Sequence, residues 1–255
     1  MTSFLDGPRP RAFAHRGWHT GDLAGCENTL AAFRRAVQEG FRYLETDVHV
    51  TLDGQLLAVH DSSLDRVTDL SGRVAELPWT RVRQARIGGR ERIPLFDELL
   101  DLLRDHPDVR LNVDPKADAA VDPLARALAD AGLVDRVCVG SFSDRRLRAV
   151  RAAAGPRLAV SLGPRAVARL VLAGRTRTRI RVPGAVAAQV PVRYGRVPVV
   201  TPGLLRAARR SGLEVHVWTV DDADDMRRLL DMGVDGLMTD RPAVLRSVLQ
   251  QRGAW

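Results

Sequence analysis

Residues 12–61 read AFAHRGWHTGDLAGCENTLAAFRRAVQEGFRYLETDVHVTLDGQLLAVHD, and this stretch decides the fold. Residues 43–50 have the alternating character of a β-strand, so Glu45 and Asp47 lie on the same face. A parallel strand buried on both sides is ordinarily apolar throughout. The acidic face therefore needs a cation, a proton donor or a solvent-filled opening in front of it.

The neighbouring residues predict how this strand is connected. A strand is expected at residues 11–15 and a helix at residues 29–39, with Asn28 as its N-cap and Gly40 at its end. This order, strand then helix then strand, is that of a parallel β/α unit.

A second connection follows the acidic strand. A turn at Asp53 and Gly54 leads into a return strand at residues 56–59, which places His60 at its end. The turn-rich residues 62–94 interrupt the alternation of strands and helices, and we interpret them as a small insertion.

The remaining chain repeats the strand-helix unit. Helices are expected at residues 96–105, 122–131, 144–153, 165–173, 202–211, 222–232 and 242–250, and strands at 109–114, 137–142, 158–161, 186–190, 214–220 and 236–239. Eight such units in 255 residues predict an α/β fold, a (β/α)₈ TIM-type barrel forming one domain over residues 1–255. An open doubly wound sheet is the alternative, but no GxGxxG follows the first strand.

In such a barrel, polar residues at the carboxyl ends of the strands converge. The candidates are His15, Arg16, Glu45, Asp47, His60, residues 112–116, Ser141, Gln189, Trp218, Thr239 and Asp240. The three carboxylates Glu45, Asp47 and Asp114 suit a hard divalent cation, Mg²⁺ or Ca²⁺, better than zinc.

Composition sets further limits. No apolar run approaches the roughly 20 residues of a membrane span, and the first residues lack the apolar core of a signal peptide. Cys26 and Cys138 lack a CxxC spacing, so two buried or half-buried thiols in a reducing, cytoplasmic compartment are expected.

The net charge of +8 arises from arginines spread along the chain, which is typical of a solvated surface. The basic stretch at residues 175–181 could also attract an anionic membrane. Of 39 basic residues only Lys116 is a lysine, so it is a candidate for a site that needs a compact ammonium group.

The segments HRG, ENT, ExD, HD, DPK, WTVDD and GVDGLMTDRP, in this order from His15 to Pro242, resemble the glycerophosphodiester phosphodiesterase family. The resemblance implies a (β/α)₈ barrel with a small insertion after the second strand. It also implies hydrolysis of glycerophosphodiesters to glycerol 3-phosphate and an alcohol, and hence a role in lipid and glycerol metabolism.

The resemblance further implies a role for each matching residue. It makes His15 and His60 the catalytic pair, Arg16 the phosphate ligand, Glu45, Asp47 and Asp114 the metal ligands, and Lys116 their neighbour. Family members commonly carry Glu where this chain has Asp114, so a metal must lie nearer to this strand or be reached through water. Asp118 is a weaker candidate for the same role.

These residue types suit phosphodiester cleavage. One histidine can take a proton from the attacking oxygen, which belongs to water or to the glycerol hydroxyl, and the other can protonate the leaving alkoxide. The cation and Arg16 can stabilise the phosphoryl charge, and Lys116 can neutralise an oxygen or hold the carboxylates.

Other polar residues have structural explanations. His19, His49, His106 and His216 are expected to be structural, and Glu27 and Asn28 to fix the first loop. Gln189 and Trp218 either fill the barrel or bind substrate at its mouth.

Two classes of function remain for the chain. The first is an enzyme on small glycerophosphodiesters, with a lysophospholipase D-like activity on lipids as its alternative and without a nucleic-acid partner. The second is a non-catalytic basic barrel that binds membranes or nucleic acids.

Overall fold

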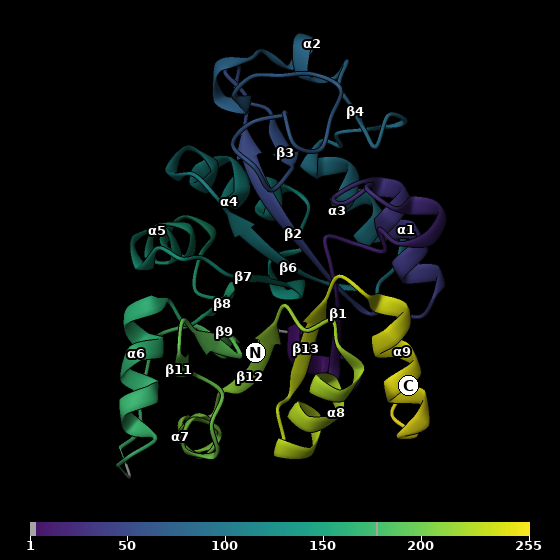
Figure 1. Cartoon of the computed structure of the whole chain (residues 1–255). Coiled ribbons are helices and arrows are strands. Elements are labelled where there is room, and N and C mark those ends of the chain that lie inside the picture. The colour runs from purple at the N-terminus through teal and green to yellow at the C-terminus, as the bar shows by residue number, and fades with distance from the viewer. Residues whose placement is uncertain (1–3, 177) are drawn as a thin grey trace.

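Eight parallel strands close into a barrel in the computed structural model, which describes residues 4–176 and 178–255 and so omits Arg177 of the basic stretch (Figure 1). The strands, in the order in which neighbours pair, are β1 (Arg11–His15), β2 (Tyr43–Val50), β6 (Arg110–Pro115), β7 (Val137–Val139), β8 (Ala159–Ser161), β9 (Ala185–Pro191), β12 (Glu214–Trp218) and β13 (Gly236–Thr239). Because β1 pairs with both β2 and β13, the sheet is closed and the open-sheet alternative is excluded.

Helices cover the outside of the barrel. They are α1 (Leu30–Gln38), α3 (Phe96–Asp105), α4 (Val121–Asp130), α5 (Asp144–Ala154), α6 (Pro164–Ala173), α7 (Pro202–Ser211), α8 (Ala223–Met232) and α9 (Pro242–Gln251). Each buries an apolar stripe, as in α3, where Leu99, Leu100 and Leu103 face the sheet. The predicted barrel is confirmed.

The first helix corrects one prediction. Its N-cap is Thr29, whose side-chain oxygen accepts a hydrogen bond from the Ala32 N–H at 3.2 Å. Asn28 instead has a φ of +57° and turns its amide toward β2, where its Oδ1 accepts from Thr46 Oγ1 at 2.7 Å. Asn28 is thus part of the packing between loop and strand and does not cap the helix.

The alternation predicted for β2 is present. Leu44, Val48 and Val50 belong to the apolar layer between sheet and helices, whereas Tyr43 belongs to a separate cluster inside the barrel. Phe4, which lies near the N-terminal end of the described chain, packs edge to face on Tyr43 with ring centroids 5.5 Å apart. These side chains pack the barrel interior toward the amino-terminal ends of its strands.

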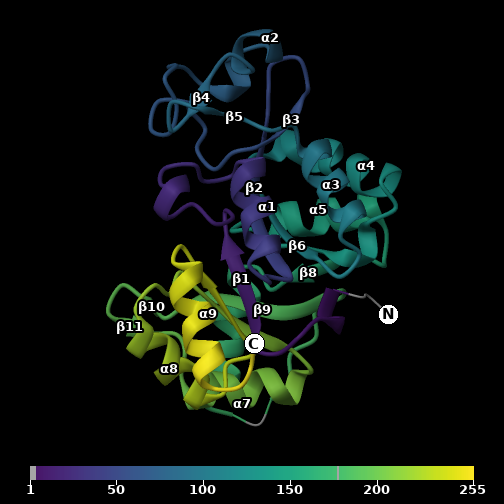
Figure 2. The same ribbon diagram turned by 90° about the vertical axis from the view of Figure 1, so that its right-hand side faces the viewer.

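The insertion has a core of its own. β3 (Leu56–Ala58) runs antiparallel to β2, followed by the short helix α2 (Trp79–Val82) and the strand pair β4 (Arg86–Ile87) and β5 (Glu91–Arg92). Figures 1 and 2 show this unit standing beyond the end of β2. Its buried apolar residues are Leu57, Val59, Leu64, Val74, Val82, Ala85, Ile87 and Ile93.

A second hairpin was not predicted. It comprises β10 (Arg193–Tyr194) and β11 (Val197–Pro198) and follows β9. In Figure 2 it projects on the side of the loop after β1, away from the N-terminus. Among the helices of the described chain, none has the length and apolar character that a bilayer crossing requires.

A buried ion pair lies at the amino-terminal end of the barrel strands, at the starts of β1 and β12. The guanidinium of Arg11, which is only 1% exposed, donates to Glu214 from Nε at 3.1 Å and from Nη2 at 2.9 Å. The His216 ring nitrogen Nε2 lies 2.9 Å from the same carboxylate. Burial raises the pKa of Glu214, but His216 and Arg11 outweigh it and lower this pKa to about 2.

We predict that Glu214→Gln lowers the free energy of unfolding by about 3 kcal/mol at neutral pH. Because the folded-state pKa lies below the ordinary value of 4.5, the stabilisation is complete above pH 4.5 and is lost as the pH falls toward 2. Denaturant unfolding of parent and variant across this range measures the difference.

Asp101→Asn is the matched control, since it removes an exposed ion pair with Arg104 and should change stability by less than about 1 kcal/mol. A difference for Glu214→Gln that is independent of pH would contradict the assigned role of the carboxylate.

Candidate functional site

Four neighbouring strands bring the predicted polar residues together at the carboxyl end of the barrel. His15 on β1 is the register partner of Glu45 on β2, and Asp47 on β2 is the partner of Asp114 on β6. β13, on the other side of β1, leads into Asp240. Adjacent parallel strands in this register necessarily place these side chains side by side.

His15 is held between two carboxylates. Its Nδ1 lies 2.6 Å from Asp240 Oδ1, and its Nε2 lies 3.7 Å from Glu45 Oε2. Burial lowers the pKa of His15, but Glu45 and Asp240 favour the imidazolium more strongly and the net pKa is raised. Asp240 also lies 3.2 Å from His19 Nε2, and despite burial its two histidine partners lower its pKa.

His60, which follows the return strand β3, has a similar support. Its Nδ1 lies 2.6 Å from Asp61 Oδ1, and Arg66 Nε donates to the other oxygen of Asp61 at 2.5 Å. The His60 carbonyl oxygen lies 3.1 Å from His49 Nε2, which gives His49 a structural role. Because a carboxylate engages Nδ1 in both His15 and His60, Nε2 is the nitrogen left for chemistry.

Arg16 adopts an unusual backbone conformation, with a φ of +56°. Such a conformation costs a non-glycine residue of the order of 1–3 kcal/mol and is concentrated at functional sites. The Arg16 guanidinium lies in the mouth, where Nη1 donates to Glu27 at 2.9 Å and Nε lies 3.3 Å from Asp47 Oδ2. Glu27 in turn pairs with Arg66 at 2.7 Å.

Lys116 bridges two of the buried carboxylates. Its Nζ lies 2.7 Å from Asp47 Oδ1 and 2.9 Å from Asp114 Oδ2. Burial lowers the pKa of Lys116, but these aspartates raise it to about 12. The same contacts, together with Arg16, keep the pKa of Asp47 low against the effect of burial.

Glu45 and Asp114 are less well compensated. Burial and the charge of Asp47 raise the pKa of both groups despite the nearby cations. Asp114 Oδ1 is buried without a hydrogen-bond partner among the described residues. Unpaired carboxylate oxygen of this kind is the donor type that Mg²⁺ and Ca²⁺ take, so the residues fit a divalent cation chemically.

In residues 4–176 and 178–255 no three His, Cys, Asp or Glu side chains already stand in a metal-binding arrangement. The ammonium group of Lys116 lies between Asp47 and Asp114 and offsets part of their negative charge. Binding a cation at these carboxylates would therefore require Lys116 to share or release one of its contacts.

The other candidates divide between the barrel interior and the surface. Gln189 Nε2 donates to Asn112 Oδ1 at 2.7 Å inside the barrel. Trp218 is partly buried and packs edge to face on Phe142, with centroids 5.5 Å apart. Asp118 pairs with arginines of α5 on the surface and does not join the carboxylate cluster.

Three supporting groups were not given their roles from the sequence. Asp240, predicted at the mouth without a role, and Asp61 orient the two histidines, and His19, interpreted as structural, shares Asp240 with His15. A signal existed for both aspartates, since Asp61 adjoins His60 and Asp240 directly follows a predicted strand.

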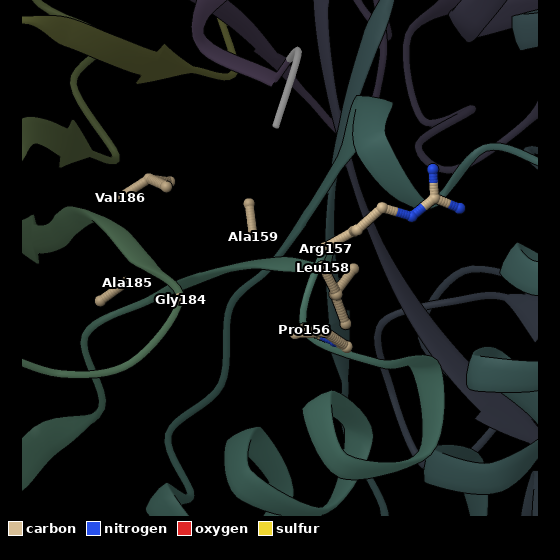
Figure 3. Close-up of a pocket in the computed structure, with 7 residues that line it drawn as sticks. All are labelled: Pro156, Arg157, Leu158, Ala159, Gly184, Ala185 and Val186. Carbon is tan, nitrogen blue, oxygen red and sulfur yellow. The ribbon is translucent and has the colours of Figure 1, made fainter. Parts of the chain in front are cut away.

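A hollow of about 300 Å³ lies at the opposite end of the barrel (Figure 3). It is at the starts of β8 and β9, and the polar cluster is at the ends of β1, β2 and β6. The residues that line it are Pro156, Arg157, Leu158, Ala159, Gly184, Ala185 and Val186. None of the candidate site residues is among them.

We predict that Asp240→Asn lowers the pKa of His15, because the remaining effect of burial disfavours the imidazolium. NMR titration of the His15 ring in chelator-treated protein measures this pKa. Asp61→Asn, which alters the contact of His60 instead, should leave the pKa of His15 unchanged. A His15 pKa that rises or stays constant in Asp240→Asn would show that Asp240 does not stabilise the charged ring.

Comparison with known proteins agrees with this geometry. The model of the glycerophosphoryl diester phosphodiesterase family matches residues 15–244. "Probable glycerophosphodiester phosphodiesterase 2" of Mycobacterium tuberculosis is 40% identical over 248 residues, which cover 96% of this chain and 92% of that protein.

Two further matches extend over most of the chain. The glycerophosphodiester phosphodiesterase of Caldanaerobacter subterraneus subsp. tengcongensis is 30% identical and covers 92% of this chain and 97% of its own. The crystal structure of a glycerophosphodiester phosphodiesterase from Agrobacterium tumefaciens has a TM-score of 0.75 and 25% identity, and covers 94% of this chain and 99% of its own.

Proposed function

The chain belongs to the glycerophosphoryl diester phosphodiesterase family, and from this premise we propose that two histidines hydrolyse its substrate by acid–base catalysis. It is a glycerophosphodiester phosphodiesterase, and the proposed products are glycerol 3-phosphate and an alcohol. The observation that carries the mechanism is that His15 and His60 are each anchored by a carboxylate at Nδ1. A histidine oriented in this way presents Nε2 for proton transfer.

The charges around the two rings suit a phosphodiester. Cleavage needs one proton removed from the attacking oxygen and one delivered to the leaving alkoxide, which two histidines in opposite protonation states can supply. Arg16, held by Glu27 and Asp47, can donate hydrogen bonds to the phosphoryl oxygens. Lys116 keeps Asp47 and Asp114 in place.

We include a divalent cation, Mg²⁺ or Ca²⁺, in the proposal. Glu45, Asp47 and Asp114 would hold it, supported by the unpartnered Asp114 Oδ1 and by the excess of buried negative charge. When bound, it would offset negative charge on the phosphoryl oxygens.

The alternative substrate is a lysophospholipid. An acyl chain would need an apolar surface beside the mouth, and Phe142, which is 67% exposed and packs on Trp218, offers one. Trp218 and Gln189 are proposed to contact the substrate from β12 and β9. Peripheral contact with an anionic membrane belongs to the same proposal, as does a cytoplasmic location, which the two free buried cysteines support.

Replacing either catalytic histidine is expected to abolish most turnover. His15→Ala and His60→Ala should each reduce kcat on glycerophosphocholine by about 10²–10⁴-fold, and the double variant should lose little more, since the two groups act together. The parent should show a bell-shaped pH profile. His106→Ala, at the far end of α3, is the control and should retain parental turnover.

Circular dichroism would verify that the histidine variants are folded. If both single variants kept near-parental rates, a non-catalytic basic barrel would become the better description.

Metal dependence is tested by chelation and by substitution of Asp114. EDTA should abolish turnover and Mg²⁺ or Ca²⁺ should restore it. Calorimetry should show cation binding to the parent, greatly weakened binding to Asp114→Ala and partial retention in Asp114→Glu, because the glutamate keeps the oxygen donors. Full turnover in metal-free buffer, or equal metal affinity in Asp114→Ala, would remove the cation from this site.

A further inference from the structure

Arginines occur along the whole chain, but the net positive charge is concentrated in one sector of the barrel because that sector lacks carboxylates. Residues 136–213, which span β7 to α7, contain 17 arginines and a single carboxylate, Asp144. At the average of the whole chain, with 31 acidic residues in 255, a stretch of this length would carry about nine. A preference for arginine over lysine cannot explain missing acids, so this charge separation needs a separate physical explanation.

Consecutive β/α units make this stretch one side of the molecule. The helices α5, α6 and α7 follow one another along the outside of the barrel in Figure 1. We call this sector, residues 136–213, the basic face. Among its described arginines only Arg145, Arg146 and Arg157 form ion pairs. Those without an ion pair include Arg148, Arg165, Arg169, Arg175, Arg179 and Arg181.

A groove of about 500 Å³ runs through the basic face between α5 and α6. α5 packs closely on α4 and α6 on α7, which leaves the space between α5 and α6 open. Leu147 and Val160 contribute to an apolar floor, and the charged residues that line it are Arg148, Arg151, Arg165, Arg169, Arg181 and Asp144. Arg151 Nε is buried there without a hydrogen-bond partner in the described structure.

The same sector also carries exposed apolar side chains. Phe142 is 67% exposed, Leu172 61%, Tyr194 80% and Val197 60%, and they represent four of the six large apolar residues that the described chain exposes. Tyr194 and Val197 are cross-strand partners in the β10–β11 hairpin, so they project together. Gly195, with a φ of +56°, supplies the tight turn that joins them.

We propose that the basic face docks on an anionic phospholipid surface, with lipid headgroups at the α5–α6 groove and the hairpin apolar pair in the interface. Arginines without partners attract the anionic surface, and apolar side chains beside them enter the headgroup region. Nucleic acid would use the arginines but would give no reason to expose Leu172, Tyr194 and Val197. The inference extends the membrane contact of the proposed function, and its test does not depend on turnover.

Cosedimentation with vesicles tests the contribution of the arginines to binding. The parent should bind vesicles of equal parts phosphatidylcholine and phosphatidylglycerol at physiological ionic strength and should not bind pure phosphatidylcholine. The triple variant Arg165→Gln/Arg169→Gln/Arg181→Gln should bind roughly 100-fold more weakly, from the contribution of each arginine near an anionic surface.

The matched control is Arg34→Gln/Arg81→Gln/Arg83→Gln, which removes the same charge from exposed arginines outside the basic face and should bind like the parent. Absence of parental binding, or equal loss in the control variant, would overturn the proposal.

The contribution of the exposed apolar side chains distinguishes a lipid surface from nucleic acid as the partner. Leu172→Ser/Tyr194→Ser/Val197→Ser should weaken vesicle binding by about 10-fold or more, since these side chains leave water on docking. Leu52→Ser, equally exposed at 66% but outside the basic face, should have no effect. Undiminished vesicle binding by the triple serine variant, with tighter binding of a single-stranded oligonucleotide at the same salt, would identify a nucleic-acid surface instead.

Turnover of soluble glycerophosphocholine in the same samples separates the two proposals. A docking variant that is folded and fully active but no longer binds vesicles supports the basic face as an independent surface. If the parent binds vesicles but hydrolyses no glycerophosphodiester, the proposed function fails and the docking surface stands.

Discussion

The barrel mouth depends on buried negative charge that its permanent cations do not fully balance. Among the described residues, Arg16 and Lys116 pair with Asp47 and Asp114, whereas Glu45 has His15 as its ion-pair partner. Leaving a buried charge uncompensated costs several kcal/mol. This cost raises the pKa of Glu45, and Glu45 and Asp240 in turn favour the protonated form of His15. Arg16, whose guanidinium lies 3.3 Å from Asp47, is held in a costly left-handed backbone conformation at this site.

Much of this arrangement could be predicted from the sequence because it is local. Alternation along β2 placed Glu45 and Asp47 on one face, and eight strand-helix units indicated a closed barrel. His60 could be placed because a short turn and return strand connect it to β2.

Contacts created by barrel closure could not be predicted in this way. His15 and Asp240 are 225 residues apart and meet because β1 pairs with β13. The capping error had a related cause: Asn28 and Thr29 are both good N-caps, and contact with Thr46 on β2 decides between them. The basic face was not predicted from the net charge, because the whole-chain value of +8 is the sum of a strongly positive sector and an acidic remainder.

The central claim is that the mouth cleaves the phosphodiester on the alcohol side, leaving the phosphate on glycerol. The most direct measurement is a ³¹P NMR time course of glycerophosphocholine with the purified protein and Mg²⁺ or Ca²⁺. The account predicts that the substrate signal is replaced by that of glycerol 3-phosphate, while choline is released. A phosphocholine signal, or an unchanged substrate signal with folded protein and either cation, would contradict it.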